Sequence, residues 1–281
     1  MTMIDRKKIE ELVRGALTEV AGDEGAARRL DSGDARVIPP DRGVNLGAPY
    51  DAQVLDGLLS STPARIAVGR SGSRYRTNTL LRFRADHAAA KDAVMSDVDP
   101  RLLERLGIFE VASQATDKKH FLARPDAGRA LSEAGRAEVA RRCARAPQLQ
   151  IIYGDGLSAA ALNEHLEGFH AALHKELAAA GIRPGTPFFV RRSRVKVMDE
   201  IARLVDAEAA LFVCGERPGL GFADSLSAYY IYRPGAGATD ANREVISNIN
   251  PRGIEPARAA KLTADALGRV LRERKSGIVL T

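Results

Sequence analysis

The sequence lacks the long apolar run that a membrane-crossing helix requires. Such a helix needs about twenty consecutive, mostly apolar residues, and no stretch of this chain approaches that length. The N-terminus, Met-Thr-Met-Ile-Asp-Arg-Lys-Lys, also lacks the apolar segment of a secretory signal. We therefore expect a soluble, cytoplasmic protein with no membrane partner.

Cysteine and clustered metal ligands are scarce as well. The only two cysteines, Cys143 and Cys214, are far apart in the chain, so neither a disulfide framework nor a zinc site is predicted. His165, His170 and His174 share one predicted helix. The last two have the i, i+4 spacing that can chelate a metal, but no glutamate follows His170 as a zinc-protease motif requires. This favours surface histidines, and we predict no metal site.

Nucleotide and hydrolase motifs are missing too. The chain has neither Gly-x-Gly-x-x-Gly after a strand nor Gly-x-x-x-x-Gly-Lys before Ser or Thr, which argues against a dinucleotide or a nucleoside triphosphate. Ser158 lacks the Gly-x-Ser-x-Gly context of a nucleophile, so it is read as a helix cap. Asp86 and His87 are adjacent and cannot face each other on a helix. Asp199 and Glu200 are read as solvated helix charges, and no catalytic set emerges.

Charge of one sign does not dominate the chain. The net charge is +6, but 42 basic residues are dispersed among 36 acidic ones, which favours a mixed-sign surface. A basic loop at residues 68–77, with Arg70, Arg74 and Arg76, could hold phosphate through backbone amides and guanidinium groups. Pairing with carboxylates of a partner is favoured over phosphate, because no helix N-terminus with the expected Lys and Ser follows the loop. A stand-alone α/β protein that binds a nucleotide or RNA remains an alternative.

Hydrophobic periodicity divides the chain into three segments. Residues 1–51 are expected to hold a short amphipathic helix, at 3–20, followed by a linker rich in Gly, Asp, Arg and Pro. Residues 52–147 show almost purely helical spacing. The expected helices of this region cover 54–59, 78–98, 100–106 and 132–146.

In the third segment, residues 148–281, short apolar runs alternate with amphipathic helices. The expected strands are 149–153, 187–190, 210–213 and 226–232, and the expected helices are 158–180, 195–205 and 256–274. This alternation predicts an α/β fold with a mostly parallel, Rossmann-like sheet and helices on both faces. The dinucleotide fingerprint of such folds is absent.

The most distinctive stretch, residues 211–221, is an apolar run that ends in a glycine-rich turn. Loops at the carboxyl ends of parallel strands meet at one sheet edge. The turn should therefore meet residues 155–156 and 191–195, and the loop expected at 246–250 could join them. These loops offer amides, one acid and small residues, which suit a large, amide-rich ligand better than a polyphosphate.

Several strings, in order along the chain, resemble the small (light) subunit of ethanolamine ammonia-lyase. The resemblance runs from about Arg65 to Ile278. The strings that carry it are Gly69-Arg70, Thr79-Leu80-Leu81-Arg82-Phe83, Arg124-Pro125-Asp126, Asp155-Gly156-Leu157-Ser158, Gly185-Thr186-Pro187-Phe188-Phe189-Val190-Arg191, Arg194-Val195-Lys196, Gly215-Glu216-Arg217-Pro218-Gly219-Leu220-Gly221, Ser225-Leu226-Ser227, Ser247-Asn248-Ile249 and Lys275-Ser276-Gly277-Ile278.

The resemblance implies a carbon–nitrogen lyase that is active only as a hetero-oligomer. A large subunit would house the active site, so no catalytic residue is expected in this chain. Adenosylcobalamin would lie between the two subunits, and the complex would convert ethanolamine to acetaldehyde and ammonia by a radical mechanism. No nucleic-acid partner follows from this reading.

The resemblance also implies residue roles. The cobalamin contacts of the family fall on Val195, Glu216 and Val245. Known relatives can have cysteine at the position of Val245, so contact there could be through the backbone or through packing. The chain has no Asp-x-His-x-x-Gly, so dimethylbenzimidazole is expected to stay on cobalt. The helix at residues 3–20 becomes a candidate encapsulation tag for a bacterial microcompartment, with docking onto its own domain as the alternative.

Overall fold

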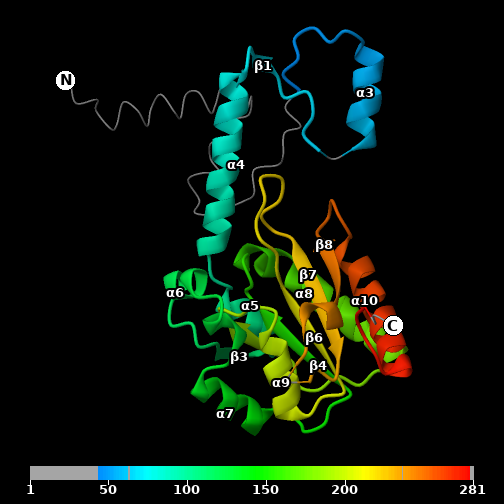
Figure 1. The fold of residues 1–281 in the computed structure, drawn as a ribbon. Coiled ribbons are helices and arrows are strands. Elements are labelled where there is room, and N and C mark those ends of the chain that lie inside the picture. Colours follow the sequence, from blue (N-terminus) through cyan, green and yellow to red (C-terminus); the bar gives the residue numbers. More distant parts are fainter. Residues whose placement is uncertain (1–43, 63, 236, 279–281) are drawn as a thin grey trace, which may run out of the picture. The chain divides into compact units, whose positions relative to one another are not determined.

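The computed structural model describes residues 44–62, 64–235 and 237–278, and these include a six-stranded sheet (Figure 1). Its strands, in spatial order, are β3 (Phe109–Ala112), β5 (Phe188–Arg191), β4 (Leu149–Gly154), β6 (Ala209–Gly215), β7 (Leu226–Tyr232) and β8 (Glu244–Ile249). The first four strands are parallel, and β7 is antiparallel to both of its neighbours. The predicted, mostly parallel α/β sheet is confirmed.

The central strands are buried along their whole length because both faces of the sheet are covered. Every residue of β4 and β6 is buried. Side chains alternate between the two faces, as in β5, where Phe188 and Val190 enter one core and Phe189 the other. Continuous apolar runs of this kind are typical of parallel strands covered by helices.

Helices cover both faces, as predicted. On one side, here called the α8 face, lie α5 (Pro100–Arg105), α8 (Ala159–Ala179) and α10 (Pro256–Glu273). On the other side, the α9 face, lie α7 (Glu133–Arg142) and α9 (Val197–Val205). Figure 1 shows α8 and α10 on the opposite side of the sheet from α9.

The region expected to be helical contains the predicted helices and three unpredicted strands, of which β3 belongs to the six-stranded sheet. Besides α5 and α7 it holds α3 (Ala52–Ser61), α4 (Thr77–Met95), α6 (Lys118–Ala123) and η1 (Ala127–Arg129). Strand β3 pairs in parallel with β5, so the expectation of almost purely helical structure over 52–147 does not hold at this point. The division into domains at residue 147 remains a prediction.

Two expected loops contain strands. The basic loop at 68–77 forms a small hairpin of β1 (Arg70–Ser71) and β2 (Arg74–Tyr75), in which the Arg70 guanidinium lies 4.7 Å from the centre of the Tyr75 ring. The loop expected at 246–250 is mostly strand β8. Three of the six residues of β8 are polar, and five are exposed or only partly buried, so its sequence carries little apolar signal.

The predicted amphipathic helix at residues 3–20 lies outside the described residues. Within the described part of the chain, no helix combines the length and apolar character needed to cross a bilayer.

Candidate functional site

The loops after β4, β5 and β6 meet at the carboxyl edge of the sheet, as predicted. The Asp155 carboxylate accepts hydrogen bonds from the backbone N–H groups of Arg192 and Ser193, at 2.8 and 2.9 Å. The backbone N–H of Leu157 donates to the Gly215 carbonyl at 3.0 Å. Burial raises the pKa of Asp155, while these two backbone donors act in the opposite direction. Asp155 therefore joins two loops and is not a free acid at the surface.

The glycines at the start of the ligand loop are required by packing. A Cβ atom on Gly215 would lie 1.9 Å from the Ser158 carbonyl oxygen, and one on Gly156 would lie 2.4 Å from the Gly215 carbonyl oxygen. Gly221, by contrast, has no heavy atom within 4 Å of its Cβ position. The glycine signal that marked this loop thus arises partly from close contact between loops. Ser158 caps α8 as predicted, accepting from the Ala161 N–H at 3.3 Å.

Glu216 connects three strands at this edge. Its Oε1 accepts hydrogen bonds from the Ser227 hydroxyl and from the Asn248 N–H, both at 2.6 Å. Its own N–H donates to the Ser225 carbonyl at 2.8 Å. The described residues donate no hydrogen bond to the other carboxylate oxygen, Oε2. Because the side chain is only partly buried, Oε2 is available to an outside donor.

A bulge in β8 supplies the Asn248 donor. Leu226 pairs with Ile249 and Ala228 pairs with Ile246, so β8 contains one residue more than β7 over this stretch. The extra residue is accommodated with Asn248 at a φ of 60°, a conformation that asparagine tolerates better than most residues. The bulge frees the Asn248 N–H from the regular ladder and directs it to Glu216.

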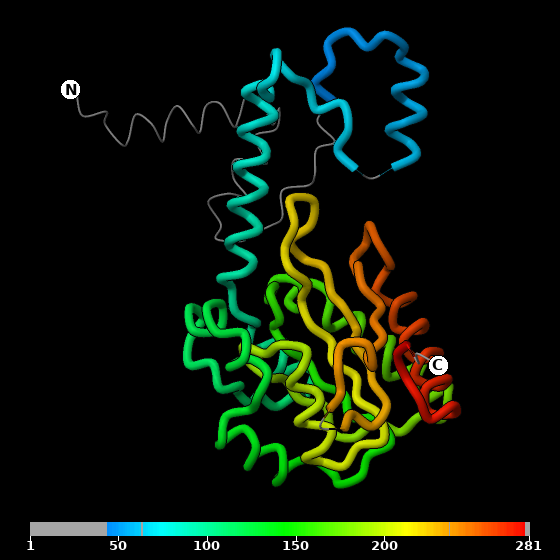
Figure 2. The backbone as a smooth tube through the Cα atoms, viewed as in Figure 1, coloured from blue at the N-terminus to red at the C-terminus, as the bar shows by residue number. Residues whose placement is uncertain are grey.

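Asn250 fixes the turn after β8. Its side-chain amide donates to the Ser225 hydroxyl at 3.1 Å and to the Asn248 side-chain oxygen at 2.8 Å. Its Oδ1 accepts from the backbone N–H groups of Arg252 and Gly253, both at 2.9 Å. Figure 2 shows that the tip after β8 and the loop after β6 lie at the same end of the sheet. The support from Ser227 and Asn250 was not predicted, because it depends on the bulge.

Val245 and Val195 lie on the same face of the sheet. Phe212, Tyr229 and Val245 occupy consecutive positions across β6, β7 and β8, and Phe212 and Tyr229 belong to the core on the α9 face. Val245 is 46% exposed. Val195, in the turn before α9, is partly buried against the same core.

These candidates are not all close together. Val245 precedes Asn248 by three residues, which is roughly 10 Å along a strand, and Asn248 is the residue that contacts Glu216. One ligand that touches Val245 and Glu216 must therefore be large.

The histidines and the first turn of α9 differ from the expectation of exposed groups. His165 is buried, with its Nε2 3.6 Å from Asp224 Oδ2, and it lowers the pKa of that carboxyl. The Tyr153 hydroxyl lies 2.7 Å from His170 Nδ1, and burial lowers the pKa of His170 to about 4. The surface-histidine prediction is wrong because these side chains point from α8 into or along the core. Among the described residues, no group of His, Cys, Asp and Glu could hold a metal ion.

Asp199 and Glu200 are likewise not simple solvated charges. Asp199 forms a buried ion pair with Arg243. Glu200 accepts from the Leu131 N–H at 2.8 Å and pairs with Arg136. Both cysteines are buried free thiols.

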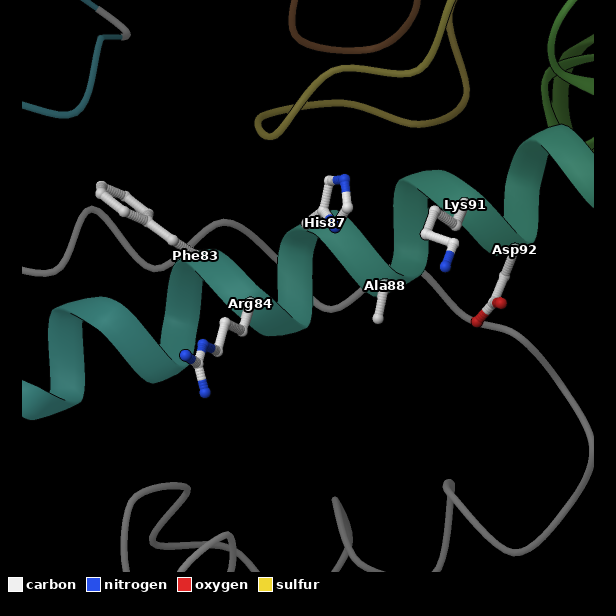
Figure 3. A pocket seen from close by; sticks show the side chains of 6 residues that line it. All are labelled: Phe83, Arg84, His87, Ala88, Lys91 and Asp92. Atoms are coloured by element: carbon white, nitrogen blue, oxygen red, sulfur yellow. The ribbon is translucent and has the colours of Figure 1, made fainter.

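The described residues also line two cavities. One of about 400 Å³ is lined by six residues of α4, including Phe83, His87 and Asp92 (Figure 3). Another of about 420 Å³ lies at the amino ends of the strands, near Gln148 and Glu208. Neither is lined by Val195, Glu216 or Val245.

Comparison with protein families gives one match. The family described as ethanolamine ammonia-lyase light chain (EutC) matches residues 52–281. The matched range begins with α3 and includes the whole sheet and all three candidate residues.

Proposed function

Since this match covers most of the chain, the protein belongs to the ethanolamine ammonia-lyase light-chain family, and we propose that it binds the lower side of adenosylcobalamin against the large catalytic subunit. A light chain implies a heavy-chain partner, so the lyase is a hetero-oligomer. The complex converts ethanolamine to acetaldehyde and ammonia, with the reacting groups in the large subunit. The observation that carries this proposal is the free oxygen of Glu216 on an open sheet edge.

The residues at this edge fit a corrin. The rim of a corrin carries many side-chain amides, which are hydrogen-bond donors, and its ring is large and largely apolar. Glu216 offers Oε2 to such a donor, and charged acceptors form stronger hydrogen bonds than neutral ones. Val245 offers exposed apolar surface on the same side. The separation of roughly 10 Å along β8 matches a ligand of that size better than a small metabolite.

The chain's own residues hold and orient the cofactor. Ser227 and Asn248 hold Oε1 of Glu216, so the direction of Oε2 is fixed before the cofactor binds. Such preorganisation lowers the entropic cost of binding. Val195 and Val245 exclude water beside the ring. When bound, adenosylcobalamin supplies the radical chemistry, and the protein contributes binding and orientation.

We predict that Glu216→Ala weakens cobalamin retention in the reconstituted two-chain complex. Loss of one hydrogen bond to a charged acceptor corresponds to about 1.5–3 kcal/mol, or at least about tenfold in affinity. Equilibrium dialysis with hydroxocobalamin measures the effect. Glu164→Ala removes an exposed glutamate of α8 and is the control.

Glu216→Gln separates binding from folding. Its side-chain oxygen can still accept from Ser227 and Asn248, so the edge should keep its structure, while the charged acceptor is lost. Because the NH2 group then takes the place of Oε2 and cannot accept a hydrogen bond, retention should fall about as far as in Glu216→Ala. An affinity for hydroxocobalamin equal to wild type in both variants would remove Glu216 from the site.

The N-terminal segment carries a separate part of the proposal. Residues 3–20, outside the described range, are proposed to direct the enzyme into a bacterial microcompartment in the cytoplasm. Deleting residues 1–20 should leave lyase activity of the complex intact and abolish its co-purification with microcompartment shells. Unchanged co-purification would reject the tag and favour docking within the enzyme.

A further inference from the structure

Three arginines gather beside the candidate cofactor residues. Arg194 directly precedes Val195, and Arg217 directly follows Glu216. Arg129 is brought to the same place by the fold: the Arg194 N–H donates to the carbonyl of Gly128 at 2.7 Å. The two segments approach so closely that a Cβ on Gly128 would lie 2.8 Å from Arg194 Cγ.

The Arg194 side chain is held in place, but not all of its hydrogen-bond donors have acceptors among the described residues. Its guanidinium carbon lies 4.3 Å from the centre of the Phe121 ring, and its Nη2 donates to the Phe121 carbonyl at 3.2 Å. Its Nε is buried and has no hydrogen-bond partner among the residues that the structure describes. The nearby Arg192 differs, because its Nη1 donates to the carbonyls of Ala115 and Thr116. Arg194 is therefore a positioned cation with donors left over.

The positive charge at this place is not balanced by ion pairs. Within the described ranges, none of Arg129, Arg194 and Arg217 forms an ion pair with a carboxylate, whereas arginines close by do: Arg124 pairs with Asp126 and Arg191 with Glu110. Burial lowers the pKa of Arg194, and so do the charges of Arg129 and Arg217, against an opposing effect of Asp155. Arg129 and Arg217 are exposed. An anion placed between these groups would relieve their mutual repulsion.

We propose that Arg129, Arg194 and Arg217 bind the phosphodiester in the nucleotide tail of the cobalamin. This inference rests on the proposed function, since the tail hangs from the lower side of the corrin that this chain is proposed to face. The phosphodiester is the anionic group of that tail, in a molecule whose other polar groups are mostly amides. The planar guanidinium fork matches phosphate oxygens in geometry and charge.

A comparison of two corrinoids tests the site. Hydroxocobalamin has the tail, and cobinamide has the same ring amides without the tail or its phosphodiester. Both are titrated against the reconstituted two-chain complex by equilibrium dialysis. Arg129→Gln and Arg217→Gln remove exposed cations with little risk to folding. Arg258→Gln, at an exposed arginine of α10 on the other face, is the matched control.

Each variant should bind hydroxocobalamin about tenfold more weakly, and cobinamide as tightly as the wild type does. The double variant should also lose most of the salt dependence of hydroxocobalamin binding, because that dependence reports screened charges. Arg258→Gln should bind both corrinoids normally.

Other results overturn the proposal. If the Arg→Gln variants bound both corrinoids equally more weakly, the arginines would affect binding indirectly, by maintaining the fold. Unchanged affinities would place them outside the site. Weaker association of the two chains, measured by sedimentation, with normal corrinoid binding would assign the arginines to an acidic partner surface. A wild-type complex that binds neither corrinoid would contradict the proposed function as well. Glu216→Gln, which should weaken both corrinoids alike, distinguishes failure of the phosphodiester site from failure of the whole site.

Discussion

The two sides of strand β8 differ in what covers them. Ile246 and Ile249 face the α8 side, where they pack against the core beneath α10. Val245 faces the α9 side and is 46% exposed. The same strand thus contributes one side to stability and leaves an apolar side chain exposed on the other.

The bulge at Asn248 produces part of this difference. In a regular strand Ile249 would point to the same side as Val245, because side chains alternate with period two. The extra residue turns Ile249 into the α8 core, where its exposure is 0%, and turns the Asn248 N–H toward Glu216. The one-residue insertion therefore buries Ile249 on the α8 side and also supplies the hydrogen-bond donor that holds Glu216 in place.

The largest effect on the free energy of unfolding should come from a substitution on the buried, α8 side of β8. Ile249→Ala removes a fully buried side chain and should lower the free energy of unfolding by about 2–5 kcal/mol. Urea denaturation of the full-length chain measures this loss. A loss below about 1 kcal/mol would mean that the edge is loosely packed and that the two sides of β8 are not distinct.

A smaller effect on the free energy of unfolding is expected at low pH, through His170 on the α8 face. Burial lowers the pKa of His170 from 6.5 to about 4, so the unfolded chain binds a proton between these pH values that the folded chain does not. Stability should therefore fall as the pH is lowered from 6.5 toward 4. Because the ring is only partly buried, we expect about 1–2 kcal/mol from this group.

The variant His170→Gln isolates this contribution. Glutamine does not titrate and can still form a hydrogen bond with the Tyr153 hydroxyl. Urea denaturation at several pH values should show a shallower decline for the variant than for the wild type. Some decline should remain, because burial also lowers the pKa of His174. Identical pH profiles would show that His170 is solvated in the folded protein.

Sequence patterns predicted the buried central strands better than the exposed strands at the edges of the sheet. Strands β4 and β6 were found because both faces are buried and their residues are mostly apolar. Strand β3 has only four residues, with Glu110 exposed between Phe109 and Val111, which is too short to distinguish from a helix turn. Strand β8 was read as a loop for a similar reason.

Prediction from sequence has the same limit at the candidate site. Glu216 and Val195 were identified from a family resemblance, and their loops were expected to converge from the order of strands and helices. The hydrogen bonds from Ser227 and Asn248 depend on a bulge that no local pattern specifies. The approach of Arg129 to Arg194 joins segments more than sixty residues apart. Such contacts arise only from the tertiary structure.

The smallest stability effect should come from the open side. Val245→Ala deletes exposed methyl groups and should change the free energy of unfolding by less than about 0.5 kcal/mol. It should still weaken hydroxocobalamin binding to the two-chain complex by about fourfold, since the loss of apolar contact with the ring is about one CH₂ equivalent, or about 0.8 kcal/mol. Val245→Cys keeps a side chain of similar size and should bind normally. The opposite result would be a Val245→Ala variant that is as destabilised as Ile249→Ala and binds the cofactor normally. Val245 would then belong to the core, and the α9 side of β8 would not be a binding surface.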